Sequence, residues 1–172
     1  MAQLTDMPAG FVPIQIVDVT FGVGAGRQNS RPDVLLVQFA LNKIMAAPGG
    51  RGALPDVSKP SVAGPLGPTA QLLKPLVVDG VFGTKTFAAI KAYQGASVNN
   101  QSTLLVDGGI DPVHTFLAGA GSDPIGGGLN VLTKAPRYTI SKLNSDILKL
   151  YGTVLQVGEL PVEVQTSIRA HR

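Results

Sequence analysis

The chain has 172 residues, of which 44% are hydrophobic and 15% are charged. This composition excludes a disordered chain and the length excludes a barrel enzyme, so we expect one domain of ordinary size with additions. The 14 Lys and Arg residues outnumber the 11 Asp and Glu residues only slightly, and they form no stripe of the kind that binds nucleic acid. The absence of cysteine excludes disulfides, cysteine nucleophiles and thiolate metal sites.

The start of the chain and its apolar stretches bear on localisation. The first ten residues have neither a basic start nor a continuous apolar segment, so they do not form an ordinary signal peptide. Pro, Gly or a charged residue interrupts each apolar stretch before it reaches the roughly 18 residues that span a bilayer. We therefore expect cytoplasmic synthesis and no membrane span. Any role at the cell envelope then requires delivery by another route, or as part of a phage or secretion machine.

The first predicted element is a strand at 11–21, where apolar residues occupy first one face and then the other. Pro13 places this strand at the edge of a sheet, where it could pair with a neighbouring chain. Gly22, Gly24 and Gly26 then interrupt the pattern. We interpret them as a flexible connection and not a phosphate-binding loop, because the segment lacks the Lys of a P-loop.

Residues 33–45 predict a helix that is apolar on nearly all sides. Pro32 suits its beginning, and Val34, Val37, Leu41 and Ile44 recur at helical spacing on one face. A second face is also apolar, and a helix of this kind is normally buried, so either the rest of the chain or a partner must cover it. The candidates for a partner contact are Leu35, Leu36 and Phe39.

Residues 46–76 form a long insertion rich in Pro and Gly, in which only 69–74 is predicted to be helical. The segment that follows, 77–94, contains an Asp79-Gly80 turn and then a helix that Thr84 can cap. The triplet Val-Asp-Gly at 78–80 recurs at 106–108. This internal repeat is too short to indicate a solenoid.

The C-terminal part is predicted to be mostly helical. Residues 139–151 carry apolar residues on one face and are followed by Gly152, which is typical of an amphipathic helix and its end. A short strand is predicted at 154–157. Pro161 then begins a last helix.

Three motifs between about residues 30 and 118 resemble the small helical peptidoglycan-binding domain found at the ends of many bacterial and phage cell-wall hydrolases. The first is a helix pattern, V-x-x-L-Q-x-x-L. The second is D-G-x-F-G-x-x-T followed by an aromatic-Gln pair, and the third is a second Asp-Gly turn. The matching residues are Val34, Val37, Gln38 and Leu41, then Asp79, Gly80, Phe82, Gly83, Thr86, Tyr93 and Gln94, then Asp107, Gly108, Ile110 and Pro112.

The resemblance implies a mainly α fold, a compact three-helix domain with Asp-Gly turns at 30–120. Around it we expect an N-terminal extension at 1–29 with the edge strand, the insertion at 46–76, and a C-terminal helical addition at 121–172. The chain departs from the family pattern in this insertion and in Asp111, which stands in place of a Gly. The family's next Thr falls near His114 and Thr115, with a slip of one residue.

The resemblance also implies a shallow groove that meets sugar or peptide, with Tyr93 and Gln94 as the better candidates. The full set of ligand-binding candidates is Gln38, Asp79, Tyr93, Gln94 and Asp107. The remaining motif residues are expected to serve the fold: Gly80 allows the turn, Asp79 folds its carboxylate onto nearby amides, Phe82 fills the core, and Thr84 or Thr86 caps a helix. The structural set is Gly80, Phe82, Gly83, Thr86 and Gly108.

The residues offer little for catalysis. A zinc peptidase needs more ligands than the two histidines, His114 and His171, and no G-x-S-x-G motif accompanies them. The only Glu residues are Glu159 and Glu163, so a glycosidase would have to use an Asp pair such as Asp107 with Asp111 in a structural turn. We expect no enzyme activity, no metal and no cofactor.

Two functions remain open. The first is a non-catalytic peptidoglycan recognition module that binds glycan strands or stem peptides. The second is a structural or assembly subunit of a phage tail or injection machine, as a homo-oligomer or part of a larger assembly, which reuses the fold for protein contacts. The apolar second face of the helix at 33–45 and the extra segments at both ends favour the second function.

Overall fold

A computed structural model gives the structure of the chain and describes residues 2–7, 14–50, 52–56, 62–64, 67–69, 71–99, 105–112 and 139–170. In these ranges the fold is mainly α, as predicted, with two small two-stranded sheets. No helix there is both long and apolar enough to cross a membrane. The helices are α1 (Arg31–Met45), α2 (Thr84–Asn99), α5 (Thr139–Tyr151) and α6 (Val162–Arg169).

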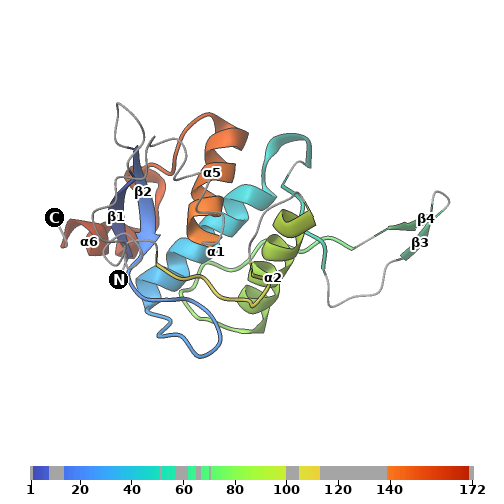
Figure 1. The fold of residues 1–172 in the computed structure, drawn as a ribbon, viewed down its shortest axis with the longest axis horizontal. Coiled ribbons are helices and arrows are strands. Elements are labelled where there is room, and N and C mark those ends of the chain that lie inside the picture. The colour runs from blue at the N-terminus through green and yellow to red at the C-terminus, as the bar shows by residue number, and fades with distance from the viewer. Residues whose placement is uncertain are drawn as a thin grey trace, which may run out of the picture.

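Helix α1 lies at the centre of the molecule, with α5 and α6 on one side and α2 on another (Figure 1). Its two apolar faces are therefore covered by the chain itself. Leu36 is fully buried and Leu35 is 4% exposed, while Phe39 is half-buried at the edge of the core. The interpretation of Leu35 and Leu36 as partner contacts is wrong, because α5, α6 and the first Asp-Gly turn occupy the space that a partner would have filled.

The strand predicted at 11–21 is confirmed as β2 (Ile14–Val19), and Pro13 lies outside the described residues. It pairs antiparallel with β1 (Ala2–Met7) of the same chain, so that Ala2 lies opposite Val19. One edge of β2 is thus already occupied. Asp33 joins the sheet to α1, because its carboxylate accepts the backbone N–H groups of Thr20 and Phe21 at 3.0 and 3.1 Å.

Two short predictions are wrong. No helix forms in the described residues of 69–74: the hairpin strand β4 (Gly67–Thr69) ends at Thr69, and Leu72 forms a β-bridge with Pro55. Six residues are too few to offset the cost of starting a helix. No strand forms at 154–157, where the chain turns into a 3-10 helix at Val157–Glu159.

The long insertion contains a 3-10 turn at Pro48–Gly50 and a hairpin of β3 (Val62–Gly64) and β4. The hairpin stands out from the helices (Figure 1). Each strand of this hairpin has three residues, so few backbone hydrogen bonds can join the two strands.

One hydrophobic core contains residues from segments that the sequence analysis assigned to different parts of the chain. It contains Val19 from the N-terminal extension, Leu41 from α1, Ile147 from α5 and Ile168 from α6. The predicted boundary at 120/121, together with His114, Thr115 and His171, lies outside the described residues. Since α5 and α6 pack on α1, the C-terminal helices share the core of the predicted domain.

We predict that Ile147→Ala lowers the free energy of unfolding by about 2–5 kcal/mol, because it leaves a cavity in a fully buried part of this core. Val162→Ala, at a position 76% exposed, should change it by less than about 0.5 kcal/mol. Urea denaturation followed by circular dichroism measures both. Two separate transitions, with Ile147→Ala shifting only one, would show that α5 unfolds apart from α1.

Candidate functional site

The first Asp-Gly turn is held by the side-chain amide of Gln38 on α1. Gln38 Nε2 donates to Asp79 Oδ1, the Val81 carbonyl and Thr86 Oγ1 at 3.0, 3.1 and 3.2 Å. In return, Gln38 Oε1 accepts the N–H groups of Asp79 and Gly80 at 3.1 and 2.9 Å. Asp79 Oδ1 also accepts the Val81 N–H at 2.9 Å, which confirms that this carboxylate folds back onto its own turn.

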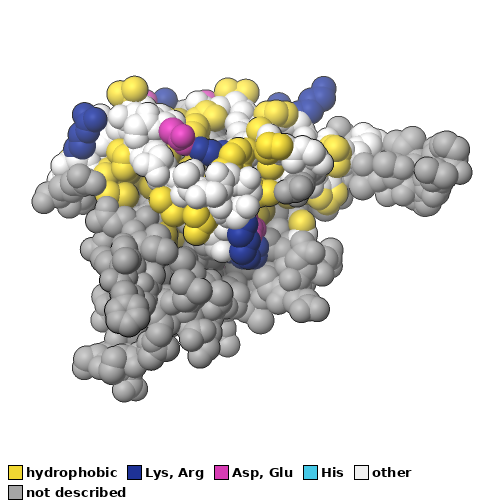
Figure 2. Space-filling model, turned by 90° about the horizontal axis from the view of Figure 1, so that it is seen from above, with side chains coloured by type: hydrophobic (Ala, Val, Ile, Leu, Met, Phe, Trp, Pro, Cys, Tyr) yellow, Lys and Arg dark blue, Asp and Glu magenta, His cyan; other side chains and the backbone are white. Residues whose placement is uncertain are grey.

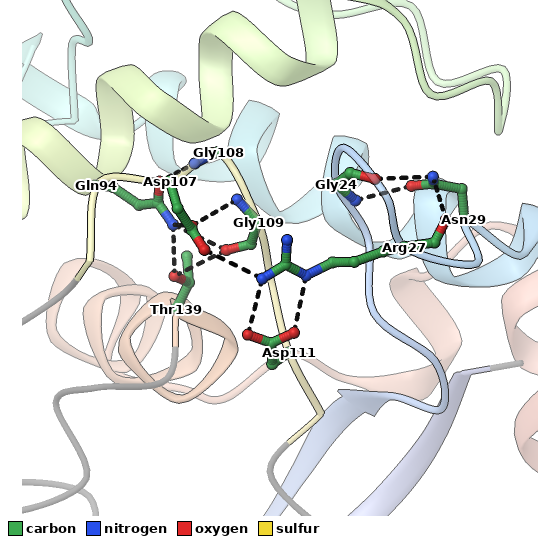
Figure 3. Close-up of polar contacts among 9 residues, drawn as sticks. All are labelled: Gly24, Arg27, Asn29, Gln94, Asp107, Gly108, Gly109, Asp111 and Thr139. Atoms are coloured by element: carbon green, nitrogen blue, oxygen red, sulfur yellow. Dashed lines mark hydrogen bonds and ion pairs between the residues drawn. The ribbon is translucent and has the colours of Figure 1, made fainter.

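The second Asp-Gly turn is held in the same way by Gln94 on α2. Gln94 Nε2 donates to Asp107 Oδ1, the Gly109 carbonyl and Thr139 Oγ1 at 3.1, 2.8 and 3.1 Å. Its Oε1 accepts the Gly108 N–H at 2.8 Å, and Asp107 Oδ1 accepts the Gly109 N–H at 2.8 Å. Figure 3 shows this set of bonds converging on Gln94.

The two glutamine clamps form a structural repeat. In each, a helix supplies a buried Gln, the next segment supplies Asp-Gly, and a helix further along the described chain supplies a Thr near its beginning. The repeated Val-Asp-Gly triplet in the sequence indicated the two turns but not the Gln and Thr residues that contact them. Thr139 on α5 contacts Gln94 at the second turn as Thr86 on α2 contacts Gln38 at the first.

Glycine is required at both turns. Gly80 and Gly108 have φ values of 73° and 76°, a region that other residues rarely adopt. A Cβ atom on Gly108 would lie 2.2 Å from the Phe87 ring, and one on Gly80 would lie 2.7 Å from the Arg31 side chain. The backbone of each turn thus packs directly against a neighbouring side chain.

The clamps change the roles predicted for several residues. Gln38 and Gln94 are 2% and 1% exposed and bonded within the chain, so they hold turns and do not present their amides to a ligand. Thr86 accepts from Gln38, and the described bonds show no cap by Thr84. Gly83 precedes α2, and its carbonyl accepts the Phe87 N–H at 3.0 Å. Phe82 is half-buried against the core.

Arg27 ties the N-terminal loop to the second turn. Its Nε and Nη2 donate to the two carboxylate oxygens of Asp111 at 2.8 and 3.0 Å, and Nη2 also reaches Asp107 Oδ2 at 3.1 Å (Figure 3). The hydrogen bond to Asp111 is the main cause that raises the pKa of Arg27 above its ordinary value. Sequence patterns could not predict this contact, because Arg27 and Asp111 lie 84 residues apart.

The loop that carries Arg27 is an ordered structure and not a flexible connection, contrary to our interpretation of its glycines. Val23 and Ile110 exchange backbone hydrogen bonds of 2.9 and 2.7 Å. Asn29, at a φ of 53°, accepts the Gly24 N–H through its side chain and donates to the carbonyls of Gly24 and Arg27. These bonds position the guanidinium.

Both turn aspartates remain readily ionised. The pKa of Asp79 is lowered, first by the hydrogen bond from the Val81 N–H and then by that from Gln38. For Asp107, partial burial would raise the pKa, but bonds from Gly109, Gln94 and Arg27 together bring it below its ordinary value.

The first turn forms one wall of a surface hollow of about 300 Å³, which we call the first-turn hollow. Its lining combines apolar groups with a carboxylate, a side-chain amide, two hydroxyls and an amine. The residues are Gln38, Leu76, Val77, Asp79, Val81, Gly83, Thr84, Lys85 and Thr86. Four of them, Gln38, Asp79, Gly83 and Thr86, belong to the motifs that suggested the resemblance.

Aromatic residues connect the two turns. The Phe82 and Phe87 rings pack edge to face with centroids 6.4 Å apart, and Lys91 Nζ lies 5.6 Å from the Phe87 centroid. Because Phe87 also lies against Gly108, both turns sit near the beginning of α2. On the face shown in Figure 2, charged side chains lie singly or near charges of opposite sign among hydrophobic ones.

Tyr93 lies in a different place from the other predicted ligand-binding residues. Its ring is 2% exposed, and its hydroxyl donates to Asp146 Oδ2 on α5 at 2.7 Å. It lines a second hollow, between α2 and α5, together with Lys142 and Lys149. The predicted site residues are thus divided: Asp79 is exposed at the first-turn hollow, Asp107 is exposed at the second turn, and Tyr93 lines the second hollow.

No group of three or more His, Asp or Glu side chains arranged to hold a metal occurs in the ranges that the structure describes. Comparisons with protein-family models, curated proteins and solved structures found no match for the chain. A functional assignment therefore rests on its own residues.

We predict that Gln94→Ala lowers the free energy of unfolding by about 3 kcal/mol, because the Gly108 N–H and the Gly109 carbonyl lose a buried partner. The matched control is Gln156→Ala, at an exposed side chain with a single 3.3 Å bond to Val154, and it should change stability by less than about 0.5 kcal/mol. Urea denaturation measures both. Equal, small effects would mean that the clamp does not hold the turn.

The lowered pKa of Asp107 makes stability depend on pH. Above the unfolded pKa of about 3.9, the ionised carboxylate contributes its full stabilisation, which is lost as the pH falls through the lower folded pKa. Asp107→Asn removes this ionisation, so the stability difference between wild type and variant should be larger at pH 7 than at pH 2.5. Urea denaturation at both pH values measures the difference, and a constant difference would contradict the contribution of the charge.

Proposed function

We propose that the chain is a non-catalytic peptidoglycan recognition module that contacts the wall at the first-turn hollow. The observation that carries the proposal is the lining of this hollow by Gln38, Asp79, Gly83 and Thr86, the residues of the peptidoglycan-binding resemblance. Asp79 is the member of this set that is both polar and exposed.

The chemistry of the hollow suits a glycan strand or a stem peptide. The hydrogen bonds from Gln38 Nε2 and from the Val81 N–H both go to Oδ1 of the Asp79 carboxylate, and Oδ2 can accept from a sugar hydroxyl or a peptide N–H. Lys85 supplies a donor, and Thr84 supplies both a donor and an acceptor. Val77 and Val81 can pack against the C–H groups of a sugar ring or an alanine methyl group.

The hollow is shallow, and individual contacts with it are expected to be weak. A repeating polymer offsets this weakness, since several copies of the module held together raise the effective concentration of each site. This favours a wall polymer over a single soluble sugar.

The state of the aspartates supports a non-catalytic role. A glycosidase needs a carboxylic acid whose pKa is raised so that it can donate a proton. Asp107 and Asp111 share Arg27, and the pKa of Asp107 is lowered. These carboxylates act as ion-pair partners that fix the second turn.

One observation favours the assembly subunit as a second candidate. Among the described residues, the exposed large hydrophobic side chains are concentrated in the segments just before and within the two turns, where a partner protein could cover them. Those in these segments are Leu72, Val77, Val78, Val81, Leu105 and Val106. Sedimentation velocity distinguishes this candidate, because an assembly subunit would self-associate and Leu105→Ser would reduce that association.

Co-sedimentation with purified peptidoglycan sacculi tests the proposal. Wild-type protein should pellet with sacculi, and Lys85→Ala should weaken binding about tenfold, because one hydrogen bond from a charged group is lost. Val81→Ser should also weaken it. These positions are exposed, so the variants should remain folded.

The matched controls are Arg169→Ala and Val162→Ser on α6, which remove an exposed cation and an exposed Val away from the hollow. They should bind like wild type. If wild type does not pellet, or if the Lys85 and Val81 variants pellet as well as the controls, the hollow is not a wall-binding site.

A further inference from the structure

The second hollow, which we call the α2–α5 hollow, has a volume of about 430 Å³. This is within the range of small-molecule sites, which are concave, mostly apolar and fitted with a few polar groups. It lies between the ends of α1 and α2, one face of α5 and residues 52–54. The lining residues that decide its chemistry are Ile44, Leu54, Tyr93, Lys142, Asp146 and Lys149.

One wall of the α2–α5 hollow is charged. Lys142, Asp146 and Lys149 are spaced by four and three residues, so they share a face of α5. The Asp146 carboxylate is already satisfied: Lys142 Nζ contacts both of its oxygens, and the Tyr93 hydroxyl donates to Oδ2 at 2.7 Å. Lys149 is exposed and makes no ion pair within the described chain. Among the residues that the structure describes, this wall thus keeps one positive charge, that of Lys149, without an ion-pair partner.

The lining of the α2–α5 hollow also includes apolar residues that contacts within the chain hold in place. Ile44 and Leu54 are 3% and 4% exposed, and Leu150 packs at the edge of the same core. Gly52 lies so close to the end of α1 that a Cβ atom there would be 1.7 Å from the Ile44 carbonyl oxygen. Leu54 is held by a 2.9 Å hydrogen bond from the Leu73 N–H to its carbonyl. These contacts fix the wall without a ligand.

We propose that the α2–α5 hollow binds a carboxylate that carries a short apolar chain. The carboxylate pairs with Lys149 at the rim, and the apolar chain lies against Ala53, Ala96 and Leu150, the apolar lining residues that are exposed or half-buried. An organic cation is disfavoured because the carboxylate of Asp146 is taken by Lys142 and Tyr93. Such a ligand could be a free carboxylic acid or the C-terminus of a small peptide, since both present the same group next to an apolar body.

Titration of the ¹⁵N-labelled full chain with hexanoate, followed by NMR, tests this site. Hexanoate should shift the amides of Tyr93, Ala96 and Lys149. Hexylammonium, which has the same chain and the opposite charge, should shift them at least about fivefold less at equal concentration. N-acetyl-dialanine replaces hexanoate in a third arm and shows whether a peptide C-terminus or a free acid is the better ligand.

Lys149→Gln should weaken hexanoate binding roughly fivefold, the upper effect of an exposed ion pair. The matched control is Lys74→Gln, which removes an exposed lysine that does not line the hollow and should bind like wild type. Unshifted amides at the three positions, equal binding of hexylammonium, or wild-type affinity in Lys149→Gln would each overturn the proposal.

This site does not depend on the proposed wall-binding function. Lys85→Ala should leave hexanoate binding unchanged, because Lys85 lines the first-turn hollow and not the α2–α5 hollow. Failure of sacculus binding and failure of carboxylate binding are therefore separate results.

Discussion

The structure depends on the need of two buried glutamine amides for hydrogen-bond partners. A buried amide without partners costs several kcal/mol in an apolar interior, so Gln38 and Gln94 are stable only where a turn and a threonine surround them. Each clamp therefore fixes three elements at once: the helix that carries the Gln, the Asp-Gly turn, and the beginning of the helix that carries the Thr. The helices α1, α2 and α5 are joined in this way although long segments separate them in the chain.

The clamps also determine where function can reside. The hydrogen bonds of the clamps occupy the polar groups of the motif residues. A ligand at the turns therefore contacts the groups around them, which are the second oxygen of Asp79, Lys85 and the exposed valines. At the second turn, Arg27 pairs with the negative charges of Asp107 and Asp111, so this turn has less unpaired charge than the first. The two turns are alike in backbone and different in what they offer a ligand.

The sequence was sufficient for α1, α2, α5 and α6, because their apolar periodicity and their end signals are local properties. The bounds predicted for α5 agree with the structure, and Pro32 and Pro161 mark the beginnings of α1 and α6. The site was less predictable, because the role of a polar residue depends on partners far away. Gln38 looks the same in sequence whether its amide meets a ligand or the Gly80 N–H. The contact of Arg27 with Asp111 and that of Gln94 with Thr139 span 84 and 45 residues and leave no periodic signal.

Helix α2 connects the two candidate sites and also keeps them apart. Thr84 and Lys85 at its beginning line the first-turn hollow, and Tyr93 and Ala96 nearer its end line the α2–α5 hollow. Eight residues from Lys85 to Tyr93 correspond to about 12 Å along a helix, more than one sugar ring or short acyl chain can span. Both ligands could therefore bind at once. Because Gln94 on this helix also holds the second turn, loss of that clamp would disturb α2 where Tyr93 lies. Substitutions at the exposed residues Lys85 and Lys149 therefore test the two sites independently of each other.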